Sequence, residues 1–300
     1  MLTVSDALRD AAARLAASSD TARLDAELLM AHALGVSRSD LLLRHMGDPV
    51  PDGFAGLVER RATHEPAAYI TGRQEFYGLD LEVTSAVLIP RADSETLVEA
   101  AREALADRAP QHILDLGTGS GALLLAALTI WPEAEGLGLD RSVEALLVAI
   151  RNAQLHANTP VGIVGAGPFD LPPPKPDRGL ARFIQGDWRK PGWTKHLRRF
   201  DLILCNPPYV ESDAALEPAV RGWEPAGALF AGPEGLDDYR ILLRQLPELL
   251  TESGVAIFEI GATQAQQVAD IAAGSGFASE LRRDLAGRPR ALVLRLGLGK

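Results

Sequence analysis

A glycine-rich turn follows a short apolar run near the middle of the chain. The run 113–116 leads into Gly117-Thr118-Gly119-Ser120-Gly121, and an apolar helical segment begins at Ala122. Glycines permit a tight turn and close approach of a ligand to the backbone, and a helix N-terminus offers free N–H groups. The glycine spacing is not that of a dinucleotide loop, and no Lys-Ser/Thr pair of a phosphate loop follows. A nucleophile elbow at Ser120 would need glycine where Thr118 and Ala122 stand.

Three further side chains could complete a site for a nucleoside. Asp140 ends the next apolar run, where a carboxylate can accept hydrogen bonds from both hydroxyls of a ribose. The alternative for Asp140 is the N-cap of the following helix. Asp187 and Trp188 follow the third run, so the indole could lie on an adenine face while the carboxylate accepts from the adenine amino group. The alternative for Trp188 is a position in the core.

The sequence Asn206-Pro207-Pro208-Tyr209 follows the fourth apolar run and could hold a planar amide or aromatic amine. Such a nitrogen is a poor nucleophile, because its lone pair is delocalised, and it carries two N–H donors. The Asn206 side-chain oxygen can accept one hydrogen bond and the Pro207 carbonyl the other, on a backbone that the two prolines fix. Tyr209 offers a flat face. These four residues are the candidate catalytic residues, acting through positioning and electrostatics without a general base or a metal.

Short β-rich runs alternate with helical segments from about residue 86 onwards, which predicts an α/β fold with a mostly parallel, doubly wound sheet. The predicted strands are residues 112–116, 136–139, 182–185, 201–205, 254–259 and 291–294. Ligands bind at the carboxyl ends of the strands in such sheets. We therefore expect the fourth strand beside the first, with Asn206 next to the glycine turn.

The chain before this sheet is predicted to be helical, with Ser5 and Ser39 as candidate N-caps. Apolar residues recur there at helical spacing, as in Val4, Leu8, Ala12 and Leu15. Residues 75–83 alternate around Gly78, which predicts a β-hairpin. These patterns divide the chain into a helical domain (1–68), a hairpin linker (69–85) and a sheet domain (86–300).

Residues 158–180 are rich in proline and glycine, which favours an exposed loop. We expect residues 160–178 to be dispensable for activity.

Composition limits the location and the partners. Cys205 is the single cysteine, so a disulfide framework is impossible and a reducing, cytoplasmic location is expected. Residues 1–10 lack the apolar run of a signal peptide, and no stretch approaches the roughly 18 apolar residues of a membrane span. The net charge of −10 disfavours sequence-independent binding to the phosphates of DNA. The histidines show no metal-ligand spacing.

The pattern Asp115-x-Gly-x-Gly-x-Gly resembles the cofactor loop of methyltransferases. Together with Asn206-Pro207-Pro208-Tyr209, it makes the chain resemble the HemK/PrmC family, the peptide chain release factor N(5)-glutamine methyltransferases, over nearly its whole length. The further stretches that carry the resemblance are 65–72, 75–78, 88–91, 94–95, 224–225, 228–232, 235–236 and 284–288. Asn-Pro-Pro-Tyr alone is shared with DNA adenine methyltransferases, whereas these stretches are specific to the family.

The resemblance implies a Rossmann-like class I methyltransferase sheet, S-adenosyl-L-methionine as cofactor, and the glutamine of the Gly-Gly-Gln motif in class I release factors as acceptor. It also implies that the helical domain docks the protein substrate. By motif match the cofactor would be lined by Gly117, Thr118, Gly119, Ser120, Gly121, Asp140, Asp187, Trp188 and Asn206. The glutamine would be held by Asn206, Pro207, Pro208, Tyr209 and Arg91. We expect a monomer that binds release factors and neither DNA nor membrane.

Three other functions are compatible with parts of this pattern. A ribosomal-protein glutamine methyltransferase would use the same chemistry and differ only in docking. A nucleic-acid adenine N6-methyltransferase would share Asn-Pro-Pro-Tyr, but the net charge and the lack of a recognisable target-recognition domain count against it. A non-catalytic scaffold that retains the fold would have no need for the intact motifs.

Overall fold

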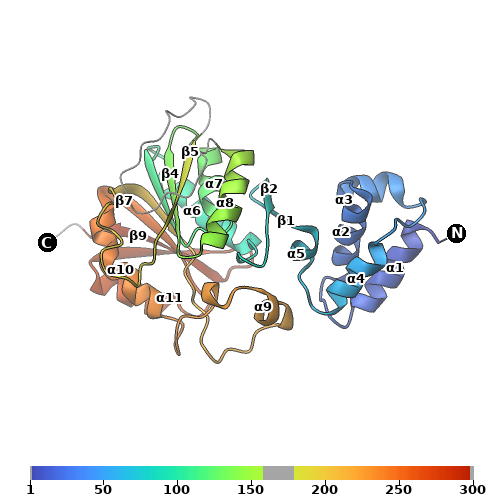
Figure 1. The fold of residues 1–300 in the computed structure, drawn as a ribbon. Helices are drawn as coiled ribbons and strands as arrows, with labels where there is room; N and C mark the ends of the chain where they lie inside the picture. Colours follow the sequence, from blue (N-terminus) through green and yellow to red (C-terminus); the bar gives the residue numbers. More distant parts are fainter. Residues whose placement is uncertain (1, 158–178, 298–300) are drawn as a thin grey trace. The chain divides into compact units, whose positions relative to one another are not determined.

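The computed structural model describes residues 2–157 and 179–297, and these divide into two compact units (Figure 1). The first unit runs to Arg73 and also includes Leu216–Glu224; the second contains Gln74–Ala215 and the chain from Pro225 onwards. The proline-rich segment 160–178, which we expect to be dispensable, lies wholly outside the described residues.

The first unit is helical, as the sequence predicts. Its elements are α1 (Val4–Leu15), α2 (Ala22–Leu34), α3 (Arg38–Asp40), the π-helical turn η1 (Leu41–His45), α4 (Phe54–Ala62), α5 (Ala67–Thr71) and α9 (Pro218–Trp223). Val4, Leu8 and Leu15 are fully buried in its apolar core. The predicted N-caps are wrong: the hydroxyls that accept from the first turns belong to Thr3 and Ser37. Each helix therefore begins before the serine expected to cap it.

The second unit is built on one sheet, whose described strands follow the order β5-β4-β3-β6-β7-β9-β8. The strands are β3 (His112–Leu116), β4 (Glu135–Asp140), β5 (Leu180–Gln185), β6 (Phe200–Cys205), β7 (Leu250–Glu259), β8 (Phe277–Arg283) and β9 (Pro289–Leu296). Neighbours from β5 to β7 are parallel, whereas β9 is antiparallel to both β7 and β8. This confirms the doubly wound α/β sheet and the six predicted strands. Only β8 was missed, because most of its side chains are exposed and give no apolar run.

Helices cover both faces of the sheet and enclose two apolar clusters (Figure 1). Alternate strand residues point to opposite faces, so Ile113 and Leu202 belong to one cluster while Leu114 and Ile203 belong to the other. The first face is covered by α6 (Glu95–Ala104), α7 (Ala122–Ile130) and α8 (Val143–His156), and the second by α10 (Asp237–Leu249) and α11 (Ala265–Gly274). Cys205 is fully buried in the second cluster, as expected of a strand residue.

The predicted hairpin is present as β1 (Arg73–Phe76) and β2 (Leu79–Glu82). Its turn residues Tyr77 and Gly78 both have a positive φ, +52° and +76°, as a tight turn between right-handed twisted strands requires. The Tyr77 N–H donates to Glu95 Oε1 over 2.9 Å, and its hydroxyl donates to Glu99 Oε1 over 2.6 Å. These bonds attach the turn to α6, so the hairpin from Gln74 onwards belongs to the second unit.

Residues 2–157 and 179–297 contain neither a membrane-spanning helix nor a metal-binding cluster. No helix there is long and apolar enough to cross a membrane. No three side chains of His, Cys, Asp or Glu there are grouped so that they could hold a metal ion.

Candidate active site

The glycine turn and the Asn-Pro-Pro-Tyr motif emerge side by side from the sheet. β3 and β6 are parallel neighbours, and Leu116, the last residue of β3, lies opposite Cys205, the last of β6. The chain winds outwards through β4 and β5 on one side and through β7 on the other. This is the switch point of a doubly wound sheet, where a crevice opens at the carboxyl ends of the strands. The predicted juxtaposition is therefore confirmed.

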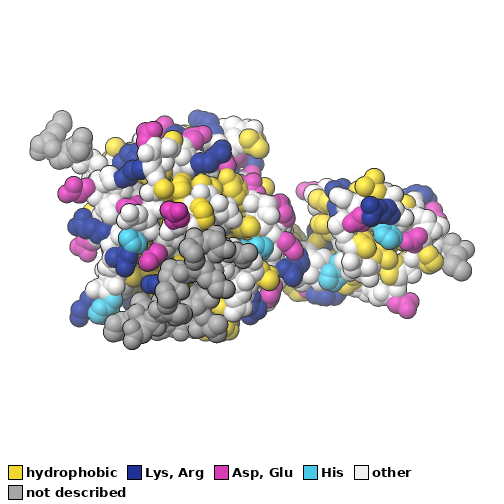
Figure 2. Space-filling model, turned by 90° about the horizontal axis from the view of Figure 1, so that it is seen from above, with side chains coloured by type: hydrophobic (Ala, Val, Ile, Leu, Met, Phe, Trp, Pro, Cys, Tyr) yellow, Lys and Arg dark blue, Asp and Glu magenta, His cyan; other side chains and the backbone are white. Residues whose placement is uncertain are grey.

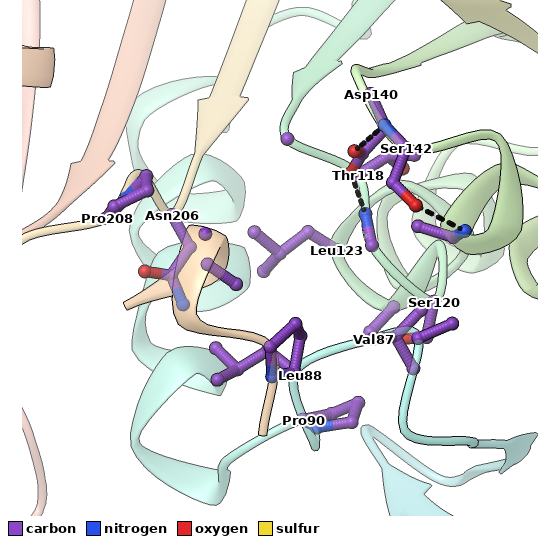
Figure 3. A pocket seen from close by; sticks show the side chains of 18 of the residues that line it. Val87, Leu88, Pro90, Thr118, Ser120, Leu123, Asp140, Ser142, Asn206 and Pro208 are labelled. Carbon is purple, nitrogen blue, oxygen red and sulfur yellow. Dashed lines mark hydrogen bonds between the residues drawn. The ribbon is translucent and has the colours of Figure 1, made fainter. Parts of the chain in front are cut away.

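A cavity of about 270 Å³ lies at this crevice (Figure 3). Ten of the residues singled out from the sequence line it: Gly117, Thr118, Gly119, Ser120, Asp140, Asp187, Trp188, Asn206, Pro208 and Arg91. Gly121, Pro207 and Tyr209 do not line it. Figure 3 shows Asn206 and Pro208 on one side, Asp140 and Thr118 on the other, and Leu88 and Leu123 between them.

The glycine turn has a backbone that ordinary residues rarely adopt. Gly117, Gly119 and Gly121 have φ values of +74°, +55° and +83°. The N–H groups of Gly117 and Thr118 both donate to the carbonyl of Leu139, over 2.8 and 3.0 Å, which ties the turn to the end of β4. A Cβ atom on Gly117 would lie 3.2 Å from the Trp188 ring, a tight contact that the ring could relieve only by moving a few tenths of an ångström.

Asp140 holds the glycine turn from the next strand. Its Oδ2 accepts from the Gly119 N–H over 3.0 Å and its Oδ1 from the Ser142 N–H over 2.9 Å. The N-cap of α8 is Ser142, whose hydroxyl accepts from the Ala145 N–H, so the reading of Asp140 as the helix cap is wrong. Burial raises the pKa of Asp140, against the hydrogen bonds that favour its charged form. Each carboxylate oxygen retains a further acceptor site.

Asp115 lies beneath the turn and is 1% exposed. Its Oδ2 accepts from the Thr118 hydroxyl over 2.6 Å. Burial raises the pKa of Asp115 to about 7, although the hydrogen bonds from Thr118 and from the Leu124 backbone oppose that rise. Burial thus moves the pKa of Asp115 towards neutral pH, which its place in the motif did not indicate.

Asn152, in α8, is a site residue that the sequence analysis missed. Its side chain is fully buried, and its Nδ2 donates to the carbonyls of Ser120 (2.9 Å) and Glu82 (3.0 Å). Its Oδ1 accepts from the Glu82 N–H over 2.7 Å. One amide therefore joins the glycine turn to strand β2 of the hairpin. A polar residue that disfavours helix interiors is the one local signal that could have revealed it.

Trp188 both lines the cavity and packs against the core, and its contact with an adenine stays a prediction. Its indole N–H donates to Asp238 Oδ1 over 2.7 Å. Asp238 is fully buried and also pairs with Arg189, whose Nη2 lies 2.7 Å from Oδ2. Asp187 Oδ1 accepts from the Arg189 N–H over 3.0 Å. Asp238 was not identified from the sequence.

The Asn206–Tyr209 segment is held from several sides. The bridge between Val210 and Phe230 fixes the chain just beyond it. The Tyr209 hydroxyl donates to Glu259 Oε1 over 3.1 Å, and the Tyr209 carbonyl accepts from Gln264 Nε2 over 3.1 Å. Burial and the Glu259 charge raise the pKa of Tyr209 above its ordinary value, so this hydroxyl stays protonated. The Tyr209 ring is therefore anchored at its hydroxyl.

A doubly wound sheet with a glycine turn after β3, an acidic residue ending β4 and Asn-Pro-Pro-Tyr after β6 defines a class I-type methyltransferase. Residues 6–72 match the family described as the PrmC N-terminal domain. A "Release factor glutamine methyltransferase" of Rhodospirillum rubrum is 39% identical over 279 residues, which cover 91% of this chain and 78% of that protein. One of the same name from Cereibacter sphaeroides is 38% identical over 303 residues, covering 98% and 99%.

Among solved structures, the release-factor-specific protein-(glutamine-N5) methyltransferase of Alicyclobacillus acidocaldarius is 23% identical, with a TM-score of 0.39. The match covers 72% of this chain and 99% of that one. On the full-length sequence similarity, the chain belongs to the release factor glutamine methyltransferase family, and the resemblance seen in its motifs is confirmed.

Proposed function

We propose that this protein transfers a methyl group from S-adenosylmethionine to the side-chain amide nitrogen of the glutamine in the Gly-Gly-Gln motif of class I release factors. The observation that carries the proposal is the placement of Asn206 and the glycine turn on one cavity at the ends of neighbouring strands. Relatives that the chain matches over most of their length bear the corresponding name.

The residues of the cavity fit S-adenosylmethionine. Asp140 has acceptor capacity for a ribose diol, and the glycine turn leaves its backbone open to close approach. Leu88 and Leu123 give the cavity apolar surface on which an adenine can lie, and Trp188 adds an aromatic ring at its wall. When bound, the cofactor supplies an electrophilic methyl group on a positively charged sulfur.

The chain's own contribution is to hold the acceptor nitrogen. The Asn206 side-chain oxygen accepts one N–H of the glutamine amide, and the carbonyl of Pro207 accepts the other. As the nitrogen forms its bond to the methyl carbon and the carbon–sulfur bond breaks, the nitrogen becomes electron-poor and these two acceptors stabilise that charge. One of its N–H protons is then lost to water. Pro207 and Pro208 are buried, so both acceptors are fixed before the substrate arrives. Arg91, at the rim of the cavity, is proposed to contact the substrate loop.

Electrostatics favours a protein substrate over DNA. The chain carries 40 acidic and 30 basic residues, and a DNA-binding face needs a concentration of the latter. On the face shown in Figure 2, the described acidic and basic side chains are interspersed rather than gathered into a basic stripe. A ribosomal-protein glutamine would satisfy the same acceptor chemistry, so docking alone separates these two substrates.

The test is a radiolabelled methyl-transfer assay with purified substrates side by side. We expect label in a release factor with its Gly-Gly-Gln motif and none after that glutamine is changed to alanine. Asn206→Ala should lose about 100-fold or more in turnover while remaining folded, by analogy with removal of one oxyanion-hole donor. Labelling of DNA, or of both release-factor forms equally, would refute the assignment. Labelling of a ribosomal protein alone would change the substrate and leave the chemistry intact.

A further inference from the structure

Glu259 is a buried carboxylate that ends β7, the strand next to the one that leads into Asn206. β7 is parallel to β6, and Phe258 lies opposite Cys205. Glu259 directly follows Phe258 and Asn206 directly follows Cys205, so both residues lie at the same edge of the sheet. The Glu259 side chain is 3% exposed. A carboxylate is costly to bury without partners, so its partners indicate its role.

The Glu259 carboxylate joins two segments that are far apart in the sequence. Its Oε1 accepts from the Tyr209 hydroxyl over 3.1 Å, and its Oε2 accepts from the Ser94 hydroxyl over 2.5 Å. Arg290 Nη1 lies 3.8 Å from Oε1 and supplies a compensating charge. Ser94 lines the cavity, whereas Tyr209 belongs to the acceptor motif. The carboxylate thus connects the cavity wall to the ring at the end of that motif.

Gln264, five positions after Glu259, binds the backbone of Tyr209. Its Nε2 donates to the Tyr209 carbonyl over 3.1 Å, and its Oε1 accepts from the Gly261 N–H over 3.1 Å. The carbonyl is also confined by Gly235, where a Cβ atom would lie 2.2 Å from it. Glu259 and Gln264, here called the tyrosine clamp, therefore fix both the hydroxyl and the backbone of Tyr209.

We propose that the tyrosine clamp positions Tyr209 for methyl transfer, with Glu259 as the residue that fixes the ring. The inference rests on the proposed role of the Asn206–Tyr209 segment as the acceptor site. A ring anchored at its hydroxyl and at its backbone has little freedom about its side-chain bonds, so its place relative to Asn206 is set before substrate binds. Glu259 does not line the cavity, so we place its effect on the acceptor site in its bond to Tyr209. Misplacement by about 1 Å at such a site can cost about 100-fold in rate.

The test is a double-mutant cycle on turnover with release factor, using Tyr209→Phe, Glu259→Ala and both together. Tyr209→Phe keeps the ring and removes the hydroxyl. We expect each single variant to lower kcat by roughly 10-fold or more, and the double variant to be no worse than the poorer single one. The dissociation constant for S-adenosylmethionine, measured by calorimetry, should stay within about twofold, since neither side chain lines the cofactor cavity. If Glu259→Ala does not fold, Glu259→Gln replaces it, because its uncharged amide offers one acceptor oxygen where the carboxylate offers two.

Tyr239→Phe is the matched control, because the Tyr239 hydroxyl donates to the backbone carbonyl of Glu259 over 2.7 Å and not to its side chain. We expect Tyr239→Phe to lower stability and leave kcat within about twofold. Losses that multiply in the double variant, or normal kcat in a folded Glu259 variant, would overturn the proposal.

A second readout does not depend on the identity of the substrate. The chain has four tyrosines, so the ζ-carbon resonances of ¹³C-labelled tyrosine can be assigned by substitution. The Tyr209 resonance should shift in the Glu259 variant while those of Tyr69 and Tyr77 stay in place, and an unmoved Tyr209 resonance would overturn the proposal. If the wild-type protein labels only a ribosomal protein, the proposed substrate fails and the same cycle is measured on that protein.

Discussion

Replacing Asn152 by alanine should weaken both the fold and the cofactor site, because one buried amide serves three backbone groups. Asn152→Ala removes hydrogen bonds to the Glu82 N–H, the Glu82 carbonyl and the Ser120 carbonyl. Each contributes a net of about 1 kcal/mol, and a backbone group left buried without a partner adds to the loss. We therefore expect the free energy of unfolding to fall by about 2–4 kcal/mol, a large share of the roughly 5–15 kcal/mol of a typical protein.

Urea unfolding and calorimetric titration with S-adenosylmethionine measure the two effects of Asn152→Ala. Cofactor affinity should fall as well, because the released Ser120 carbonyl belongs to the glycine turn. Arg151→Ala is the matched control: Arg151 also contacts Glu82, but its side chain is 44% exposed, so its loss should cost at most about 1 kcal/mol. If Asn152→Ala loses no more stability than the control and binds cofactor normally, the reasoning is refuted.

Three further predictions concern the cofactor end of the cavity. Asp140→Ala should weaken S-adenosylmethionine binding by roughly 10-fold or more, measured by calorimetry, because charged hydrogen bonds are lost; unchanged affinity would contradict ribose binding. Gly117→Ala should destabilise the protein by about 1–2 kcal/mol in thermal melts, because φ is +74° and the new Cβ meets the Trp188 ring; unchanged melting would contradict this. The third concerns pH. The pKa of Asp115 is about 7 in the folded protein, against an ordinary value of 3.8, so its protonated form stabilises the fold at low pH. This stabilisation is lost as the pH rises from 3.8 to about 7. The free energy of unfolding of Asp115→Asn, measured in urea, should rise relative to that of the wild type by up to about 4 kcal/mol between about pH 4 and 8. A difference that does not change with pH would contradict this prediction.

The parts of the site that carry a local signal could be predicted from the sequence. The glycine turn and Asn-Pro-Pro-Tyr each follow an apolar run, and the order of the strands then brings them together. The residues that support the site carry no such signal. Asn152 forms a hydrogen bond with Glu82, 70 positions away, and Glu259 forms one with Ser94, 165 positions away. No local sequence pattern predicts either contact.

The N-caps were predicted wrongly for a different reason. Thr3 and Ser5, like Ser37 and Ser39, are two candidate caps two positions apart, and propensity does not choose between them. In the fold, the earlier hydroxyl reaches the N–H three residues on, at Asp6 and at Asp40, and the later serine falls inside the first turn.

The return of residues Leu216–Glu224 to the first compact unit has a consequence for synthesis on the ribosome. The first 73 residues emerge early, yet the unit to which they belong lacks a piece until position 224 has been made. At about 5–20 residues per second, the intervening chain takes roughly 7–30 s to translate. During that interval the nascent helical unit lacks Leu216–Glu224, so the contacts of that segment within the unit form only after strands β3 to β6 have been translated.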